Sequence, residues 1–238
     1  MINLSERLYA AARLAGSSRA VADVGCDHGY LGMYLLENGM TEHVYALDVH
    51  RGPLERTREN AAAGGLSERM DFILSDGLKG LKAPYADTAL ILGMGGALIG
   101  NILEEAPAGA FEAIGAYVLG PQSEYMLFRQ KLVSLGLMVV DESHVMEEGK
   151  YYPIILAKPE KGIEEGLKKG FRLGSAEEYA YGRIGLERGD EVLKSRILKD
   201  MEVSSGLLEG NLPRGRRAQL EEKYRTAEKA LKTYYSDI

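Results

Sequence analysis

The chain has 238 residues and a formal net charge of −6, and its length leaves room for one α/β domain and a smaller appendage. Its content of 45% hydrophobic and 27% charged residues is typical of a globular protein. No stretch approaches the roughly 20 apolar residues of a membrane helix, and the first residues lack the pattern of a signal peptide. The single Cys26 excludes an intramolecular disulfide, so we expect a cytoplasmic protein with no membrane partner and no metal site.

Helix-like and strand-like segments alternate through the first part of the chain. A first helix is predicted over Leu4–Leu14, where apolar residues recur at helical spacing. The strand candidates are Ala20–Asp23, His43–Asp48, Met70–Leu74, Thr88–Leu92 and Ala116–Leu119. The helices between and after them are predicted at Tyr30–Asn38, Pro53–Ala63, Ala97–Glu104 and Glu124–Leu135. This alternation predicts a parallel sheet with helices on both faces.

The sheet is predicted to end differently. Leu137–Ser143 and Tyr151–Lys158 are strand-like and are separated by the turn Glu148-Gly149-Lys150, which leaves no room for a helix. These two strands should therefore pair antiparallel. Parallel βα units closed by such a hairpin predict an α/β fold of the class I methyltransferase type, a Rossmann-like sheet of seven strands with the last one antiparallel. A dehydrogenase-type Rossmann domain would continue with parallel units.

The composition changes after residue 160. Glu160–Leu173 is charged and glycine-rich and is interpreted as a linker or a short irregular connection. Two apolar stripes at helical spacing follow, over Leu193–Leu208 and Leu220–Tyr234, and Gly210–Pro213 separates them. They predict an antiparallel, coiled-coil-like hairpin, which must pack on something because so short a seam is marginal alone. We therefore expect a Rossmann-like domain over 1–160 and a helical C-terminal domain over 161–238.

The segment after the first strand carries the sharpest signal. A strand that enters a helix through a glycine-containing turn is the usual cradle for a nucleotide-like ligand. A carboxylate in that turn, Asp27, would repel a pyrophosphate at the helix N-terminus but suits a ligand with an ammonium and a sulfonium group. S-adenosylmethionine has both cations, whereas NAD carries a pyrophosphate. The candidate cofactor contacts in this turn are Asp23, Gly25, Cys26, Asp27, His28 and Gly29.

Later strand ends add polar groups in the order that a nucleoside ligand needs. Asp48, followed by Val49, is placed to hold ribose hydroxyls, and Ser75-Asp76-Gly77 to accept from an adenine amine. Gly93-Met94-Gly95 indicates a close approach to the backbone, next to the transferred methyl group, although a plain strand-to-helix turn would also explain it. Gly120–Glu124 supplies a rigid turn with polar groups beside the same cleft.

Together these motifs resemble those of the bacterial tRNA adenine-N1 methyltransferases that act on adenosine 22. The matching segments, in order, are Asp23–Leu31, Asp48–Pro53, Asp76–Leu78, Gly93–Gly96 and Glu147–Tyr152. The resemblance covers roughly residues 1–160, and the helical tail is consistent with the C-terminal domain of that family. One departure is Gly32, where a proline is common in the family.

The resemblance implies transfer of a methyl group from S-adenosyl-L-methionine to N1 of adenosine 22 in tRNA. Asp27 is the candidate catalytic residue, stabilising the cationic product, with a purely cofactor-holding role as the alternative. Methylation of another RNA or of a small molecule, and a non-enzymatic binding module, stay open. We expect a monomer or weak dimer.

Contacts with tRNA are predicted at two kinds of position. From Asn211 to Lys232 there are seven basic and three acidic side chains, a local charge of +4 that either attracts phosphates or marks a solvated helix face. His28 is a further candidate to contact the cofactor or the flipped base. The candidate substrate contacts are Tyr30, Lys150, Tyr151, Arg7, Arg214, Arg216 and Arg217. Lys150-Tyr151-Tyr152 is equally consistent with a charged turn followed by core tyrosines.

Overall fold

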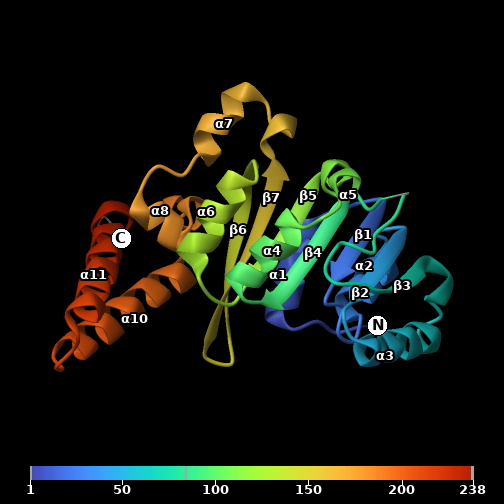
Figure 1. Ribbon diagram of the computed structural model, residues 1–238, viewed down its shortest axis with the longest axis horizontal. Helices are drawn as coiled ribbons and strands as arrows, with labels where there is room; N and C mark the ends of the chain where they lie inside the picture. The colour runs from blue at the N-terminus through green and yellow to red at the C-terminus, as the bar shows by residue number, and fades with distance from the viewer. Residues whose placement is uncertain (1, 84, 237–238) are drawn as a thin grey trace.

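The computed structural model describes residues 2–83 and 85–236 and contains a sheet of order β3-β2-β1-β4-β5-β7-β6 (Figure 1). Its strands are β1 (Ala20–Val24), β2 (His43–Asp48), β3 (Met70–Leu74), β4 (Thr88–Met94), β5 (Ala116–Pro121), β6 (Leu137–Glu147) and β7 (Lys150–Pro159). The first five pair in parallel, and β7 is antiparallel to both of its neighbours. The predicted seven-stranded Rossmann-like methyltransferase fold is therefore confirmed.

The order of the strands reverses beside β1. Because β1 pairs with β2 on one side and with β4 on the other, the crossover connections leave in opposite directions. The register sets Val24 beside Leu47 and Ile91, so the carboxyl ends of these three strands lie level. Such a switch point leaves a crevice at the edge of the sheet, where α/β proteins bind ligands.

Helices fill the connections. Those of the first part are α1 (Glu6–Ala15), α2 (Tyr30–Glu37), α3 (Arg51–Ala63), α4 (Gly96–Glu104), α5 (Ala108–Ala113) and α6 (Tyr125–Ser134), with a 3₁₀ turn at Ser67–Arg69. After β7 come a 3₁₀ turn at Glu160–Gly162, α7 (Glu165–Phe171), α8 (Ala176–Tyr181), α9 (Arg183–Glu187), α10 (Glu191–Leu208) and α11 (Arg214–Tyr234). No helix of the described residues is long and apolar enough to cross a membrane.

The interpretation of Glu160–Leu173 as a linker was wrong, because a 3₁₀ turn and α7 occupy most of it. Helices α5, α7, α8 and α9 were also not predicted, since each spans too few residues to show a helical period. One signal was present for α8: the Ser175 hydroxyl caps the Glu178 N–H and the Glu178 carboxylate accepts from the Ser175 N–H, a capping box.

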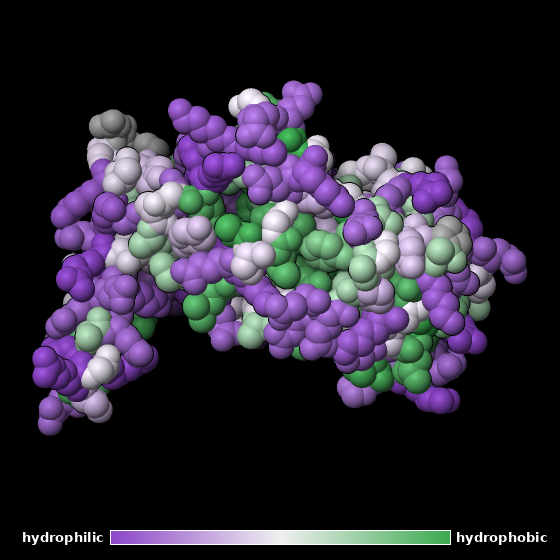
Figure 2. Space-filling view, turned by 45° about the horizontal axis from the view of Figure 1, so that its top comes forward, coloured by the Kyte–Doolittle hydropathy of each residue, from purple (hydrophilic) through white to green (hydrophobic). Residues whose placement is uncertain are grey.

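Helices α10 and α11 form an arm that folds back on itself at the far end of the sheet, as predicted (Figure 1). The outer surface of this arm is mainly hydrophilic (Figure 2). Its seam buries Leu193 and Ile197 against Ala227 and Ala230. The predicted stripe Leu220–Tyr234 contains Leu231, but Leu231 is only partly buried. Ala230, one position earlier, lies in the seam instead. The domain boundary near residue 160 stays a prediction.

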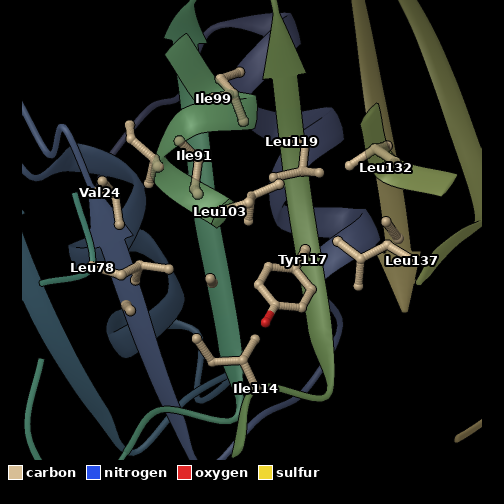
Figure 3. Packing of buried hydrophobic residues seen from close by; sticks show 14 of the residues in the cluster. Val24, Leu78, Ile91, Ile99, Leu103, Ile114, Tyr117, Leu119, Leu132 and Leu137 are labelled. Atoms are coloured by element: carbon tan, nitrogen blue, oxygen red, sulfur yellow. The ribbon is translucent and has the colours of Figure 1, made fainter. Parts of the chain in front are cut away.

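The two faces of the sheet carry separate hydrophobic clusters, since successive strand residues point to opposite sides. Ile91 and Leu119 face α4, α5 and α6, and this cluster is drawn in Figure 3. Within it the Tyr117 hydroxyl donates to the Phe111 carbonyl at 3.0 Å, so its polar atom is satisfied. Leu90, on the other face, packs with residues of α1, α2 and α3.

A buried ion pair joins the sheet to the C-terminal helices. Arg129 of α6 and Glu142 of β6 have side chains that are 1% and 0% exposed, with 2.7 Å between Nη2 and Oε1. The guanidinium also reaches the carbonyls of Tyr179, Ala180 and Tyr181 at the end of α8, at 3.4 to 3.5 Å. The chain after α8 can cross here because Gly182 has no side chain. A Cβ at this position would collide with the Glu142 carboxylate.

Replacing Arg129 by alanine should lower the free energy of unfolding by about 3–5 kcal/mol, because Glu142 would keep a buried charge without its partner. Urea denaturation of the purified protein measures this loss. The matched control is Arg172→Ala, which removes an exposed pair with Glu160 and should cost less than about 1 kcal/mol. Equal losses in the two variants would contradict a dominant role for the buried pair.

Candidate active site

A cavity of 490 Å³ opens at the switch point, at the carboxyl ends of β1, β2, β3 and β4. A volume of this size accommodates a small-molecule cofactor. The predicted contacts that line it are Arg7, Asp23, Gly25, Cys26, Asp27, His28, Tyr30, Asp48, Val49, Ser75, Asp76, Gly77, Gly93 and Met94. The lining does not include Gly29 or Gly95.

The turn after β1 is held in an unusual backbone conformation. Gly25, Asp27 and Gly29 have φ angles of 72°, 50° and 73°. Glycine adopts such angles readily and Asp tolerates them better than most residues. A Cβ at Gly25 would meet the Met94 side chain, and one at Gly29 would meet Thr57. Gly29 therefore shapes the turn from outside the cavity.

Asp23 is the buried carboxyl group of the site, with only 6% of its surface exposed. Its pKa is raised from 3.8 to about 7, mainly by burial and to a smaller extent by nearby Asp48, although a hydrogen bond from the Gly32 backbone opposes the change. A cationic ligand group beside Asp23 would favour the charged carboxylate. This position is therefore suited to an ammonium group.

The carboxylates at the next two strand ends differ in what already holds them. Asp48 accepts a hydrogen bond from the His50 N–H at 2.8 Å, which fixes the side chain at the end of β2. Asp76 lies 2.6 Å from the Lys79 ammonium, and 66% of its side chain is exposed. Asp48 is the better oriented of the two for ribose hydroxyls.

Ser75 has a structural role in the same turn. Its hydroxyl donates to the Gly77 carbonyl and accepts from the Gly80 N–H, both at 2.8 Å. These two bonds close the loop after β3 and orient Asp76. The Ser75 hydroxyl is thus engaged by the backbone, although the residue lines the cavity.

Asp27 lies at the rim, with 71% of its side chain exposed. Its Oδ1 is 3.6 Å from His28 Nε2 and 3.8 Å from Nη2 of Arg56, a residue that the sequence did not single out. The His28 ring stacks on Tyr30 with 5.6 Å between centroids and 14° between planes. Tyr30 is 46% exposed, so a carboxylate and a flat aromatic surface border the opening.

The glycine run after β4 is explained only partly by the cavity. Gly93 has a φ of 78° and lines the cavity. Gly95 and Gly96 instead accommodate the loop between β5 and α6, because Cβ atoms there would lie 3.1 Å from Ser123 Oγ and 2.6 Å from its carbonyl oxygen. The alternative of a plain strand-to-helix turn thus describes these two positions.

The predicted substrate contacts lie in three places. Arg7 lines the cavity but bonds to Glu147 at 3.1 Å, and Lys150 is exposed in the β6–β7 hairpin. The Tyr151 hydroxyl shares a hydrogen bond of 2.7 Å with His144 Nδ1, and the Arg196 guanidinium covers its ring at 5.2 Å. Tyr30 lines the cavity, and the last three contacts are at the tip of the arm, where α11 begins (Figure 1): Arg214, Arg216 and Arg217.

Apolar side chains of the cavity were also missed. Leu98 and Ile102, one turn apart on α4, form a hydrophobic wall. Their spacing of four residues, directly after the glycine run, was the available signal.

His50, which lines the cavity just before α3 and two residues after Asp48, was also missed. The described residues contain no group of three or more His, Cys, Asp or Glu placed to hold a metal ion.

Comparison with known proteins decides the family. Residues 4–155 match the methyltransferase domain family. A Bacillus subtilis relative named tRNA (adenine(22)-N(1))-methyltransferase is 31% identical over 176 residues, which are 73% of this chain and 72% of the relative. The chain belongs to the tRNA (adenine(22)-N1)-methyltransferase family.

Solved structures of the family agree with the fold over almost the whole chain. A candidate tRNA (m1A22) methyltransferase of Streptococcus pneumoniae, in complex with S-adenosyl-L-methionine, has 28% identity and a TM-score of 0.84, covering 96% of this chain and 100% of that one. TrmK of M. capricolum, in complex with S-adenosyl-homocysteine, has 25% identity and a TM-score of 0.81, covering 97% and 99%.

The buried Asp23 predicts a pH-dependent stability of the ligand-free protein. Its carboxyl binds a proton more tightly in the folded state than in the unfolded chain, so its contribution to stability is full below about pH 4 and is lost as the pH rises through about 7. The free energy of unfolding of the protein, relative to that of Asp23→Asn, should therefore fall between pH 5 and pH 7, by at most roughly 1.4 kcal/mol per unit, and level off above pH 8.

Denaturation of both proteins at several pH values measures this difference. The matched control is Glu112→Gln, a substitution at an exposed carboxyl on α5, for which the difference should not change over this range. A constant difference for Asp23→Asn would show that Asp23 does not titrate in the folded protein as the geometry requires.

Proposed function

We propose that the protein transfers the methyl group of S-adenosyl-L-methionine to N1 of adenosine 22 in tRNA. The observation that carries the proposal is the cavity at the switch point, where Asp23, Asp48 and Asp76 lie at or just beyond the carboxyl ends of three adjacent parallel strands. The chain's membership of the family, and relatives solved with this cofactor and its product, support it.

The residues present fit this cofactor. Asp23 is a buried carboxyl group whose pKa is raised mainly by burial, and an amino-acid ammonium beside it would stabilise its charged form. Asp48 suits the ribose hydroxyls, and Asp76 the adenine amine. Leu98 and Ile102 supply an apolar wall for the adenine ring. Gly25 keeps the turn open, because a side chain there would enter the space between β1 and β4.

When bound, the cofactor supplies an electrophilic methyl group: the N1 lone pair forms the new N–C bond, the S–C bond breaks with its electron pair left on sulfur, and the adenine takes the positive charge. No general base is needed, because N1 carries an in-plane lone pair. The protein's task is to align N1, to exclude water and to stabilise the developing cation. We assign the last role to Asp27, which lies at the rim of the cavity.

The target base must leave its stack before N1 is accessible. The stacked His28 and Tyr30 rings at the opening provide a flat surface for a base that has been turned out. Lys150 and Arg7 border this side of the molecule, and the basic tip of the arm supplies further phosphate contacts at Arg214, Arg216 and Arg217. We further propose that the protein is cytoplasmic and acts as a monomer or weak dimer.

Incubation with labelled S-adenosyl-L-methionine and unmodified tRNA tests the function. We expect label at N1 of adenosine 22, located by mapping of the modified base. A tRNA with guanosine at position 22 should take up no label. Label on another base, or transfer only to small molecules, would contradict the proposal.

A charge-reversed variant at the arm tip, R214E/R216E/R217E, separates RNA docking from cofactor binding in the same assay. Arg214 and Arg216 are exposed, and half-buried Arg217 loses only its hydrogen bond to the Gly210 carbonyl, so the fold should be kept. Loss of phosphate contacts should weaken tRNA binding at least about tenfold and reduce its salt dependence, with cofactor affinity unchanged in calorimetry. Unchanged tRNA affinity would remove the arm tip from the docking surface.

The variants Asp27→Ala and Asp27→Asn separate the two roles of Asp27. If its charge stabilises the cationic product, kcat should fall about 10²- to 10³-fold, with the dissociation constant of the cofactor changed less than about threefold. Single-turnover kinetics and calorimetry measure the two effects. Glu59→Gln, at an exposed carboxyl on α3, is the matched control. Loss of cofactor binding in the Asp27 variants would assign Asp27 to the cofactor instead.

A further inference from the structure

Gln122 lies where three cavities meet. It follows the end of β5 and lines the 490 Å³ cavity described above. It also lines two outer cavities, of 520 and 430 Å³, which extend from there to α10 of the arm. Tyr125, Tyr151 and Arg196 line both of these outer cavities. A base that enters from the side of the arm therefore meets Gln122 on its way to the inner cavity.

The backbone of Gln122 is fixed on both sides of its Cα. Its N–H donates to the Met94 carbonyl at 2.9 Å, and its carbonyl accepts from the Tyr125 hydroxyl at 3.2 Å. Pro121, which is buried, precedes it. The first bond joins the end of β5 to the end of β4 and the second joins it to the start of α6, so the backbone position of Gln122 is fixed.

The carboxamide of Gln122, in contrast, is uncommitted. It makes no hydrogen bond to any residue in the part of the chain that the structure describes. Its Nε2 lies 3.9 Å from where a Cβ at Gly93 would be, so the amide stands over the glycine that lines the cavity. An exposed donor and acceptor on a fixed backbone position thus lie beside the cavity without a structural partner.

Methylation at N1 restricts how the protein can recognise adenine. N1 lies on the Watson–Crick edge and must stay free to react, which leaves the N6 and N7 edge for recognition. A carboxamide matches that edge, because its oxygen accepts from N6–H and its NH₂ donates to N7. Guanine presents two acceptors there, O6 and N7, and would oppose the carboxamide oxygen. Among the described residues that line the inner cavity, Gln122 alone carries a carboxamide.

We propose that Gln122 recognises the target adenine through its N6 and N7 atoms and so turns N1 toward the reacting methyl group. This inference rests on the proposed function. The contact to N6 also strengthens during the reaction, because the positive charge that develops on the adenine makes N6–H a better donor. Gln122 thereby contributes both to the choice of base and to turnover.

The test compares tRNA that carries adenosine at position 22 with tRNA that carries 7-deazaadenosine there, a change that removes N7 and keeps N1 and N6. For the unaltered protein, kcat/KM should fall roughly 2- to 10-fold with 7-deazaadenosine, the effect of one hydrogen bond. For Gln122→Ala, kcat/KM with adenosine should fall roughly 5- to 150-fold, and the two tRNAs should become equivalent. Gln130→Ala, at an exposed glutamine on α6, is the matched control and should behave like the unaltered protein.

Calorimetry with S-adenosyl-L-methionine and an unfolding curve complete the design. The Gln122→Ala variant should bind the cofactor and unfold as the unaltered protein does, because its amide has no partner in the described structure. Discrimination against 7-deazaadenosine that survives in Gln122→Ala would overturn the inference, as would a loss of cofactor affinity that accounts for the lost turnover. If the unaltered protein does not methylate adenosine 22 at all, the proposed function fails. If it does so but does not distinguish the two tRNAs, only the inference fails.

Discussion

The reversal of strand order beside β1 is the constraint on which the candidate site depends. Because the connections to β2 and to β4 leave β1 in opposite directions, no helix covers the carboxyl ends of these strands. The parallel register then brings Asp23 and Asp48 to the same edge although 24 residues separate them. Every polar group assigned to the cofactor belongs to this edge, and Gln122 reaches it because β5 lies next to β4.

The sheet edge also explains why the site is electrostatically unfavourable without a ligand. Asp23 is buried beside a second carboxylate, and burial together with Asp48 disfavours its charged form and raises its pKa. A cationic ligand removes that penalty, so part of the binding free energy comes from relief of an unfavourable state. The same arrangement would repel a pyrophosphate, and the charge of this edge therefore selects between classes of nucleotide cofactor.

The sequence predicted the parts of the structure that repeat a simple period. Buried parallel strands are short apolar runs, and the turn Glu148-Gly149-Lys150 leaves no room for a crossover helix, so the sheet and its antiparallel end were predictable. Helices α5, α7, α8 and α9 have too few residues for periodicity to show.

Within the site, residue type indicated location better than role. The sequence placed Ser75 and Gly95 near the ligand, but the Ser75 hydroxyl closes a turn and Gly95 makes room for Ser123. Tyr151 was consistent with either an RNA contact or a core tyrosine, and its hydroxyl bonds to His144 under the arm. These roles depend on segments that are distant in sequence, such as the β5–α6 loop and α10, and no local pattern reveals which of them come together.

Contacts of α10 link the arm to the catalytic edge. The Arg196 guanidinium covers the rings of Tyr125 and Tyr151 at 5.6 and 5.2 Å, and Asp200 joins Arg196 to Lys223 of α11. Tyr125 in turn holds the carbonyl of Gln122. Bending the arm away from the sheet would break this network, and the Arg129 contacts to α8 oppose the same motion. The distance between the basic tip and the cavity is therefore fixed, which favours selection of a folded RNA by its shape over selection by a linear sequence.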